Sequence, residues 1–285
     1  MRRLLLLLAL CFSAPAAAAD LKIATWNLEW LTERPAGDPA LPANVVPRAG
    51  TDIGILRGYA ERLAADVVAV QEVDGTTVLA RVFSPDRYRL HLTNDAVVQR
   101  VGFAVRRDLA FTANPDLVGL DLYPDAKHRL RSGADITLDL PGGKLRLLAV
   151  HMKSGCRQDR LASSDRRECV TLRGQLPVLQ GWIAQRRAEG VPFVLLGDLN
   201  RWMDGNDAFL AGLSETGPLA RPTAGQTSPC WGGGGFIDHI LAGGAARGWL
   251  VEDSLRVMVF KETGIAWEER LSDHCPVSAR FRLPD

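Results

Sequence analysis

The chain has 285 residues, with 34 lysines and arginines against 33 aspartates and glutamates, so its formal net charge at pH 7 is +1. So balanced a charge excludes a global basic field that recruits nucleic acid, and any binding of a polyanion must be local. A chain of this length with 47% hydrophobic residues can bury a sizeable core, and no linker divides it.

The first nineteen residues have the organisation of a secretory signal peptide. Two arginines near the start precede an apolar run over 4–12, and small residues follow up to Ala19. We therefore assign 1–19 to a cleaved signal peptide and 20–285 to one domain, and expect a secreted or periplasmic protein. Loss of the two arginines changes the charge from +1 to −1 (+1 − 2). No other apolar run approaches about 18 residues, so no membrane span is predicted.

The elements that follow alternate between strands and helices. In chain order, the patterns predict a first strand, a loop over 34–51 and part of a helix at 57–65. Three strands follow: one that ends at Glu72, one over 88–92 and one over 101–106. A β-hairpin is predicted where segments 136–140 and 144–151 flank Pro141-Gly142-Gly143. An amphipathic helix follows over 165–187, bent near Pro177, and then strands at 191–197, 236–241, 255–260 and 277–283.

Six short segments place ionisable or amide side chains where an apolar strand ends: Ala24–Glu29, Val67–Glu72, Leu147–Lys153, Val194–Asn200, Phe236–Ile240 and Leu271–Pro276. The mixture of hairpins and strand–helix alternation predicts two packed sheets with helices outside, and polar strand ends that meet at one edge. Such an edge is a candidate active site.

The strand-end oxygens suit a hard cation. Glu72 can bind a divalent ion, and Asn27, Glu29 or Asp273 could add oxygens to it. An all-oxygen set completed by water suits Mg²⁺ or Mn²⁺ better than Zn²⁺, so we predict Mg²⁺, with Mn²⁺ as a substitute and Ca²⁺ as a further candidate.

The remaining side chains suit the hydrolysis of a phosphate ester. Asp198 can orient or deprotonate a water, and Asn200 can donate to a phosphate oxygen. His151 and His274 can place N–H groups on the same phosphate, and Asp238 can fix the tautomer of a histidine. Taken singly, each motif has a structural explanation, such as an Asx turn for Gly-Asp-x-Asn. Six of them in this order favour a function.

These motifs also carry a resemblance. Trp-Asn-Leu-Glu, Gln-Glu, a strand-end His-x-Lys, Gly-Asp-Leu-Asn, Ile-Asp-His and Ser-Asp-His together resemble the endonuclease/exonuclease/phosphatase superfamily, across essentially the whole chain after residue 19. This is the fold of deoxyribonuclease I, abasic-site endonucleases, neutral sphingomyelinases and inositol polyphosphate 5-phosphatases. The resemblance implies a four-layer α/β/β/α sandwich, with two packed mixed β-sheets flanked by helices.

The resemblance also implies roles for individual residues. Asn27 and Glu72 lie near the metal with Asp273 as a further ligand, and Asp198 aligns the nucleophilic water. It further implies that phosphate is contacted by Asn200 and His151, and that His274 is supported by Asp238. His239, where several nucleases have an aromatic residue, and the sequence Met-Lys-Ser-Gly-Cys after His151 place the chain nearer a bacterial secreted branch with diverse substrates.

Four cysteines remain after residue 19, and they allow three disulfide pairings. We favour Cys156 with Cys169, which brackets an arginine-rich excursion, and Cys230 with Cys275, which links segments adjoining Asp238 and His274. A zinc cluster is less favoured because there is no Cys-x-x-Cys pair.

The first functional hypothesis is a secreted, metal-dependent phosphodiesterase that cuts DNA or RNA. Arg131 with its neighbour Arg129 offers contacts to backbone phosphates, and Lys153 and Glu29 are weaker candidates at the substrate phosphate. The segment 157–173 carries five arginines and fits a polyanion site as well as a solvated loop that runs into a helix.

Two alternatives come from other classes. One is a sphingomyelinase-type phospholipase C or a phosphomonoesterase, although 260–267 is interrupted by charges and is no long apolar hairpin. The other is a non-catalytic binding module, which need not keep Glu72, Asp198 and His274 together. DNA or RNA, endo or exo cleavage, and the identity of the general acid stay open. No protein partner is inferred, and a monomer is expected.

Overall fold

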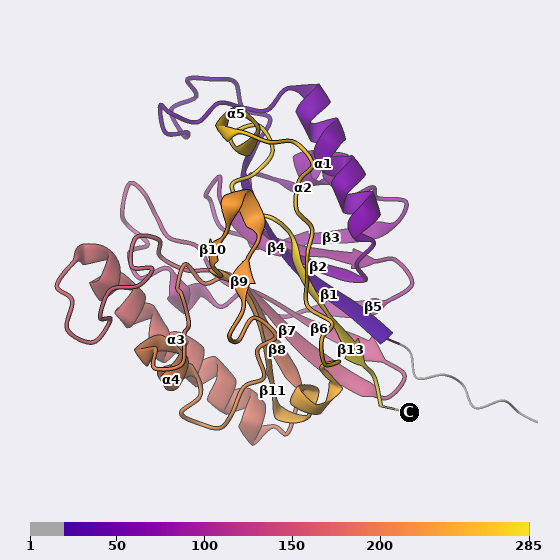
Figure 1. The fold of residues 1–285 in the computed structure, drawn as a ribbon, viewed down its shortest axis with the longest axis vertical. Coiled ribbons are helices and arrows are strands. Elements are labelled where there is room, and N and C mark those ends of the chain that lie inside the picture. Colours follow the sequence, from indigo (N-terminus) through magenta and orange to yellow (C-terminus); the bar gives the residue numbers. More distant parts are fainter. Residues whose placement is uncertain (1–19, 285) are drawn as a thin grey trace, which may run out of the picture.

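The computed structural model describes residues 20–284, and it consists of two large β-sheets packed face to face with helices outside them. In Figure 1, α1 (Gly50–Leu63) and α2 (Thr76–Val82) lie on one side of the paired sheets, and α3 (Arg167–Ala188) and α4 (Ala208–Leu213) lie on the other. The predicted signal peptide lies outside the described residues.

The first sheet has six strands in the order β12-β13-β1-β2-β4-β3. Its members are β1 (Asp20–Leu31), β2 (Val67–Val73), β3 (Tyr88–Leu92), β4 (Arg100–Arg106), β12 (Arg256–Val257) and β13 (Val277–Arg282). Only the β1–β2 pairing is parallel, so the sheet is mixed.

The second sheet has five strands in the order β11-β8-β7-β6-β5. They are β5 (Ala110–Ala113), β6 (Ala134–Leu140), β7 (Gly143–His151), β8 (Phe193–Asp198) and β11 (Asp238–Gly243), with β7 and β8 parallel. Shorter elements complete the described chain: β9 (Thr227–Ser228), β10 (Gly234–Gly235), α5 (Ile265–Glu268) and the 3₁₀ segments η1 (Val118–Leu120), η2 (Cys230–Gly232) and η3 (Gly244–Trp249).

Three apolar layers separate the four structural layers. Successive side chains of a strand point to opposite faces, so in β1 Ile23 faces the second sheet whereas Ala24 and Trp26 pack under α1 and α2. The third layer lies between the second sheet and α3, where Leu148 and Leu195 pack against Leu179. The four-layer α/β/β/α sandwich predicted from the resemblance is therefore confirmed.

Strand register brings the polar strand ends together. Asp198 at the end of β8 is paired with His151 at the end of β7 and with Asp238 at the start of β11. Asn27 of β1 is paired with Gln71 of β2 in the facing sheet, one residue before Glu72. The predicted meeting of strand ends at one edge is what this register produces.

Several predicted elements differ from those observed. Of the strand predicted at 255–260, only the two residues of β12 pair, and Met258 instead donates its backbone N–H to the carbonyl of Pro276 outside a strand. The helix predicted over 165–187 is observed as α3, which is assigned as one helix through Pro177. Helices α2 and α4 were not predicted, because seven and six residues are too few for a clear helical period. None of the helices in residues 20–284 is long and apolar enough to cross a membrane.

Candidate active site

The backbone is irregular where the strands of the first sheet reach the site. The β1–β2 register shifts between Asn27 and Leu31, and Glu29 and Trp30 adopt φ angles of 44° and 52°. Glu72 at the end of β2 has a φ of 60°. Left-handed φ values cost non-glycine residues about 1 kcal/mol or more each, and both such strain and bulges concentrate at functional sites.

Gly197 allows the second sheet to close next to the site. Its φ is 142°, and a Cβ placed on it would lie 2.0 Å from the carbonyl oxygen of Val150. Any side chain here would push β8 away from β7. The glycine of Gly-Asp-Leu-Asn therefore sets the approach of Asp198 to His151.

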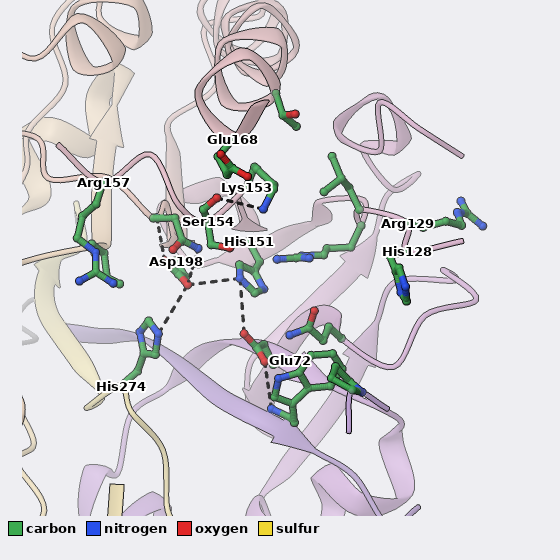
Figure 2. A pocket seen from close by; sticks show the side chains of 18 of the residues that line it. Glu72, His128, Arg129, His151, Lys153, Ser154, Arg157, Glu168, Asp198 and His274 are labelled. Atoms are coloured by element: carbon green, nitrogen blue, oxygen red, sulfur yellow. Dashed lines mark hydrogen bonds and ion pairs between the residues drawn. The ribbon is translucent and has the colours of Figure 1, made fainter. Parts of the chain in front are cut away.

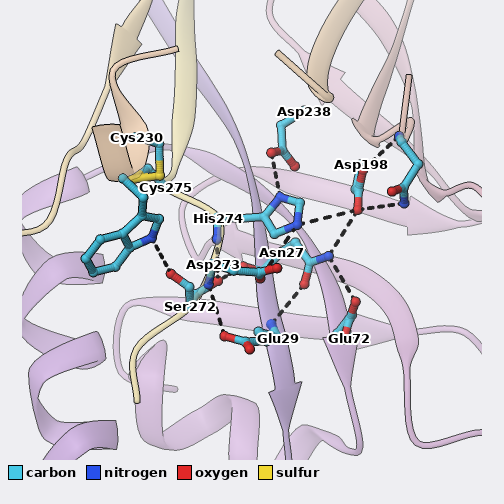
Figure 3. A network of polar contacts seen from close by, with 12 residues as sticks. Asn27, Glu29, Glu72, Asp198, Cys230, Asp238, Ser272, Asp273, His274 and Cys275 are labelled. Carbon is cyan, nitrogen blue, oxygen red and sulfur yellow. Dashed lines mark hydrogen bonds and ion pairs between the residues drawn. A yellow bond between two sulfur atoms is a disulfide. The ribbon is translucent and has the colours of Figure 1, made fainter. Parts of the chain in front are cut away.

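Asp198 is the buried centre of the polar network in Figure 3. Its Oδ1 accepts from the backbone N–H of Asn200 at 2.8 Å, and its Oδ2 accepts from Nδ2 of Asn200 at 2.9 Å and Nδ2 of Asn27 at 3.2 Å. Burial raises the pKa of Asp198 to about 7, helped by the charge of Asp238 and opposed by His274. A carboxyl group with this pKa can exchange a proton near neutral pH.

His274 is held beside Asp198 by a second carboxylate. Its Nδ1 donates to Oδ2 of Asp238 at 2.7 Å, and its Nε2 lies 3.8 Å from Oδ2 of Asp198 (Figure 3). Burial lowers the pKa of His274, but the charges of Asp238 and Asp198 outweigh burial and raise it well above its usual value. The imidazole is therefore cationic at neutral pH.

His151 has the opposite protonation state. Its Nε2 lies 3.4 Å from Oδ2 of Asp198 and 3.7 Å from Oε1 of Glu72, as Figure 2 shows. Burial, together with the positive charges of Arg131 and His274, lowers its pKa well below the usual value, so the ring is neutral. Within the described chain, the Nδ1 atom of His151 is buried without a hydrogen-bond partner.

Asn27 bridges the two carboxylates through its side-chain nitrogen. Its Nδ2 donates to Oε1 of Glu72 at 3.2 Å as well as to Asp198, and its Oδ1 accepts the backbone N–H of Glu29 at 2.9 Å. The amide oxygen proposed as a metal ligand is thus already engaged by the backbone. Glu72 keeps its position through a second bond, from the N–H of Trp30 to Oε2 at 3.1 Å.

Glu29 lies behind the loop that carries Asp273. Its Oε2 accepts the backbone N–H of Asp273 at 3.0 Å and lies 3.4 Å from Nη2 of the buried Arg48. Burial, helped by the negative charge of Asp273 and opposed by the positive charge of Arg48, raises the pKa of Glu29 to about 8. Glu29 does not line the cavity described below, whereas Asp273 and Glu72 do.

The donor set fits a hard divalent cation. Glu72 and Asp273 present carboxylates to one cavity, and carboxylate oxygens are the ligands that such cations prefer. Asp198, Asp238 and His274 form a second grouping, whose ligand atoms all lie within 4.8 Å of one another. Since Nδ1 of His274 is already hydrogen-bonded to Asp238, Glu72 and Asp273 are the better pair to hold the ion.

A cavity of about 660 Å³ opens over this network, and cationic side chains line its walls. Arg129 and His128 lie on one flank of the site in Figure 2, and Arg157 lies on the opposite flank. Lys153 and Arg131, two candidates from the sequence for contacts to the substrate phosphate, also line the cavity. Arg131 is only 9% exposed, and its Nε has no hydrogen-bond partner among the described residues.

Three residues that sequence reasoning missed organise this site: Trp30, Arg48 and Ser272. Ser272 Oγ donates to the carbonyl of Asn27 at 2.7 Å and accepts the N–H of His274 at 3.0 Å, which ties β1 to the Ser-Asp-His loop. Its place in that motif was a usable signal. No local pattern points to Arg48, which lies in the loop before α1.

Both predicted disulfides are present. Cys156 is bonded to Cys169, and Cys230 is bonded to Cys275, the residue after His274. The second bond therefore tethers the His274 loop to η2.

His239 takes no part in the site: it is buried, with Nδ1 2.7 Å from Oγ1 of Thr223, and burial lowers its pKa to about 3.

The sequence matches the profile of the Endonuclease/Exonuclease/phosphatase family over residues 24–274, so the chain belongs to this family. A search of curated proteins found no match.

Solved structures share the fold at low sequence identity. Truncated Caenorhabditis elegans TDP2 is 15% identical with a TM-score of 0.64, covering 93% of this chain and 99% of its own. D. rerio TDP2 complexed with single strand DNA product is 17% identical with a TM-score of 0.61, covering 92% and 99%. The 3′ phosphatase NExo from Neisseria, bound to product DNA hairpin, is 18% identical with a TM-score of 0.58, also covering 92% and 99%.

Proposed function

We propose that this protein is a secreted, divalent-metal-dependent phosphodiesterase that hydrolyses DNA or RNA. Family membership supports a phosphoesterase. The observation that carries the proposal is the pairing of a neutral His151 and a cationic His274 on either side of Asp198, whose pKa is about 7. A proton acceptor and two N–H donors around one cavity are what attack of water on a phosphodiester requires.

In this proposal Asp198 is the base that aligns a water and accepts its proton. Asn27 and Asn200 hold both carboxylate oxygens through hydrogen bonds of 2.8 to 3.2 Å, so the base is fixed before substrate arrives. A cation held by Glu72 and Asp273 would supply charge neutralisation at the non-bridging oxygens of the phosphate.

His274 has a different task. Its cationic Nε2–H faces the cavity while Nδ1 donates to Asp238, so it can donate to a phosphate oxygen or give a proton to the leaving oxygen. His151 is neutral, and its Nε2 can donate to the same phosphate. Asp238 positions His274 and stabilises its charge.

The choice of nucleic acid is supported by the cations around the cavity. Lys153, Arg157 and Arg167 line its mouth beside Arg131, and sequence-independent contacts to backbone phosphates need such charges. Structural neighbours with this fold were solved with DNA products, the D. rerio TDP2 and NExo. Two disulfides support folding in an oxidising compartment, in accord with a signal peptide at 1–19.

A substrate panel on the purified mature protein tests the proposal. Plasmid DNA, RNA, sphingomyelin, phosphoinositides and a bis-aryl phosphodiester are each incubated with Mg²⁺, Mn²⁺ or Ca²⁺, with Asp198→Asn as the inactive control. Metal-dependent cleavage of DNA or RNA is expected. Cleavage of sphingomyelin alone would replace the proposal by a phospholipase C, and release of inorganic phosphate alone would replace it by a phosphomonoesterase.

A further inference from the structure

A second cavity of about 690 Å³ adjoins the one over Asp198, and no role has been assigned to it so far. The two cavities share Trp30, Pro42, Gln99, His128, Arg129 and Arg131, so they lie side by side. The volume of the second cavity falls in the usual range for small-molecule sites, about 300 to 1,000 Å³.

Its walls differ in chemistry from those of the catalytic cavity. Most of the lining is apolar, including Leu41 and Val98, each only 8% exposed. Pro39 and Pro42 flank Leu41, and the fixed φ of proline restricts this wall of the cavity. Neither Glu72 nor Asp198 lines this second space. An uncharged, apolar group therefore fits it better than a second phosphate.

Trp30 stands where the two cavities meet. It is partly exposed, lines both spaces, and lies within the register shift in β1. Its backbone N–H donates to Oε2 of Glu72 at 3.1 Å, so the same residue that fixes a proposed metal ligand also places an indole beside the phosphate site. Within the bulge, Trp30 adopts a left-handed φ of 52°.

The cations where the two cavities meet indicate which kind of ligand the second cavity binds. Arg131 lines both cavities, and its Nε has no hydrogen-bond partner within residues 20–284. The exposed Lys127 extends the positive rim along the second cavity. An aromatic group joined to a phosphate matches a planar indole and apolar wall beside a buried guanidinium.

We propose that the second cavity binds the nucleobase of a nucleotide that adjoins the scissile phosphate, with the base stacked on Trp30 and its phosphate contacted by Arg131. The inference rests on the proposed nuclease activity, and it identifies the nucleobase as a part of the substrate that the protein binds. Stacking tolerates any base because every base has a π-face, so Trp30 contributes affinity without reading sequence. A lipid chain would match the apolar wall but leaves the cationic rim unused.

The test removes the base from the substrate and the indole from the protein. A short single-stranded oligonucleotide with one cleavable phosphodiester is compared with versions in which the base on either side is replaced by an abasic analogue. Wild type is expected to lose about 5-fold to 100-fold in kcat/KM, through KM, when one of the two bases is absent, which is the range for one stacked base. On the intact substrate, Trp30→Ala should have a kcat/KM as low as that of wild type on the abasic substrate. Removal of the base should lower the kcat/KM of Trp30→Ala no further.

Controls separate stacking from a damaged site. Trp30→Phe keeps an aromatic face and should restore most of the affinity. Trp249→Ala removes a partly exposed tryptophan of η3 that lines neither cavity, and should leave KM unchanged. A fall in kcat with equal sensitivity to abasic substrates would show that Trp30 only supports Glu72, and would overturn the proposal.

The remaining outcomes are distinct. If wild type cleaves all oligonucleotides equally well, the base subsite is wrong while the nuclease assignment stands. If wild type cleaves no nucleic acid but hydrolyses sphingomyelin, and Trp30→Ala raises KM for it, the space takes a lipid chain and both proposals fail.

Discussion

Two buried polar clusters in the second sheet contrast sharply, one around Asp135 of β6 and one around Asp198 of β8. Asp135 accepts from both Nε and Nη2 of Arg146, and from Nε1 of Trp182 at 2.7 Å, with Arg186 4.0 Å away. Asp198 accepts only from neutral amides, and its nearest cation, His274, lies 3.8 Å away.

The difference lies in charge balance rather than burial, since both carboxylates are almost fully buried. Two guanidinium groups face Asp135, which joins α3 to the sheet. At the candidate active site, burial raises the pKa values of Asp198 and Glu29 to about 7 and about 8, and among the described residues Asp198 has no hydrogen-bonded guanidinium to offset this effect. A buried acid that the fold leaves without a guanidinium partner is available for chemistry.

The largest expected effect comes from removing the divalent cation, because the acidic excess at Glu72 and Asp273 is what we expect the ion to balance. Excess chelator should abolish turnover, and Mg²⁺ or Mn²⁺ should restore it. The ion should also raise the Tm of wild type but not of Glu72→Gln, because this variant lacks a proposed metal ligand. The Asp135 cluster needs no added cation. Full activity in excess chelator would contradict the metal assignment.

The His274–Asp238 pair should behave as one unit. His274→Ala removes a donor to the phosphate and should lower kcat by about 10²-fold to 10³-fold. Because Asp238 is expected to act through His274, adding Asp238→Asn to His274→Ala should cost little more. The measurement is a double-mutant cycle of kcat on the substrate that the panel identifies. Losses that multiply independently would separate the two residues.

Matched substitutions in the two clusters should have opposite results. Asp198→Asn keeps the shape but removes the proton acceptor, so turnover should fall by about 10²-fold with the fold intact. Asp135→Asn leaves Arg146 without its carboxylate partner, whereas Arg186 keeps Glu189, and should destabilise the fold by about 3 kcal/mol with kcat per folded molecule unchanged. Thermal unfolding and kcat of both variants decide the comparison, and near-normal turnover in Asp198→Asn would show the site to be misassigned.

The smallest effect is the pH dependence of Asp198. With a pKa of about 7, the carboxyl is protonated as pH falls, so kcat/KM should decline about tenfold per unit below that value. Because the folded pKa lies above the ordinary 3.8, the group favours folding at low pH, and this stability is lost as pH rises through about 7. Asp198→Asn should therefore lose less Tm than wild type between pH 5 and pH 8. Identical Tm profiles would exclude a raised pKa at this residue.

Much of this architecture can be predicted from the sequence, because it depends on local patterns. Apolar runs that end in Asn27, Glu72, His151 and Asp198 identify the strands and the edge where they meet, and the placement of the cysteines, together with the predicted signal peptide, predicts both disulfides. The strand predicted at 255–260 and the unpredicted α2 and α4 show the limit, since short segments take their structure from what they pack against rather than from periodicity.

Contacts between distant segments were decided by the tertiary structure alone. The order of residues does not show that Arg48 lies 3.4 Å from Glu29 or that Trp30 lines a second cavity, and both Glu29 and Trp30 lie where the β1–β2 register shifts. The sequence motifs do not show the protonation states of the two histidines. Only burial and the neighbouring charges make His151 neutral and His274 cationic, because a pKa depends on the surroundings that the fold assembles.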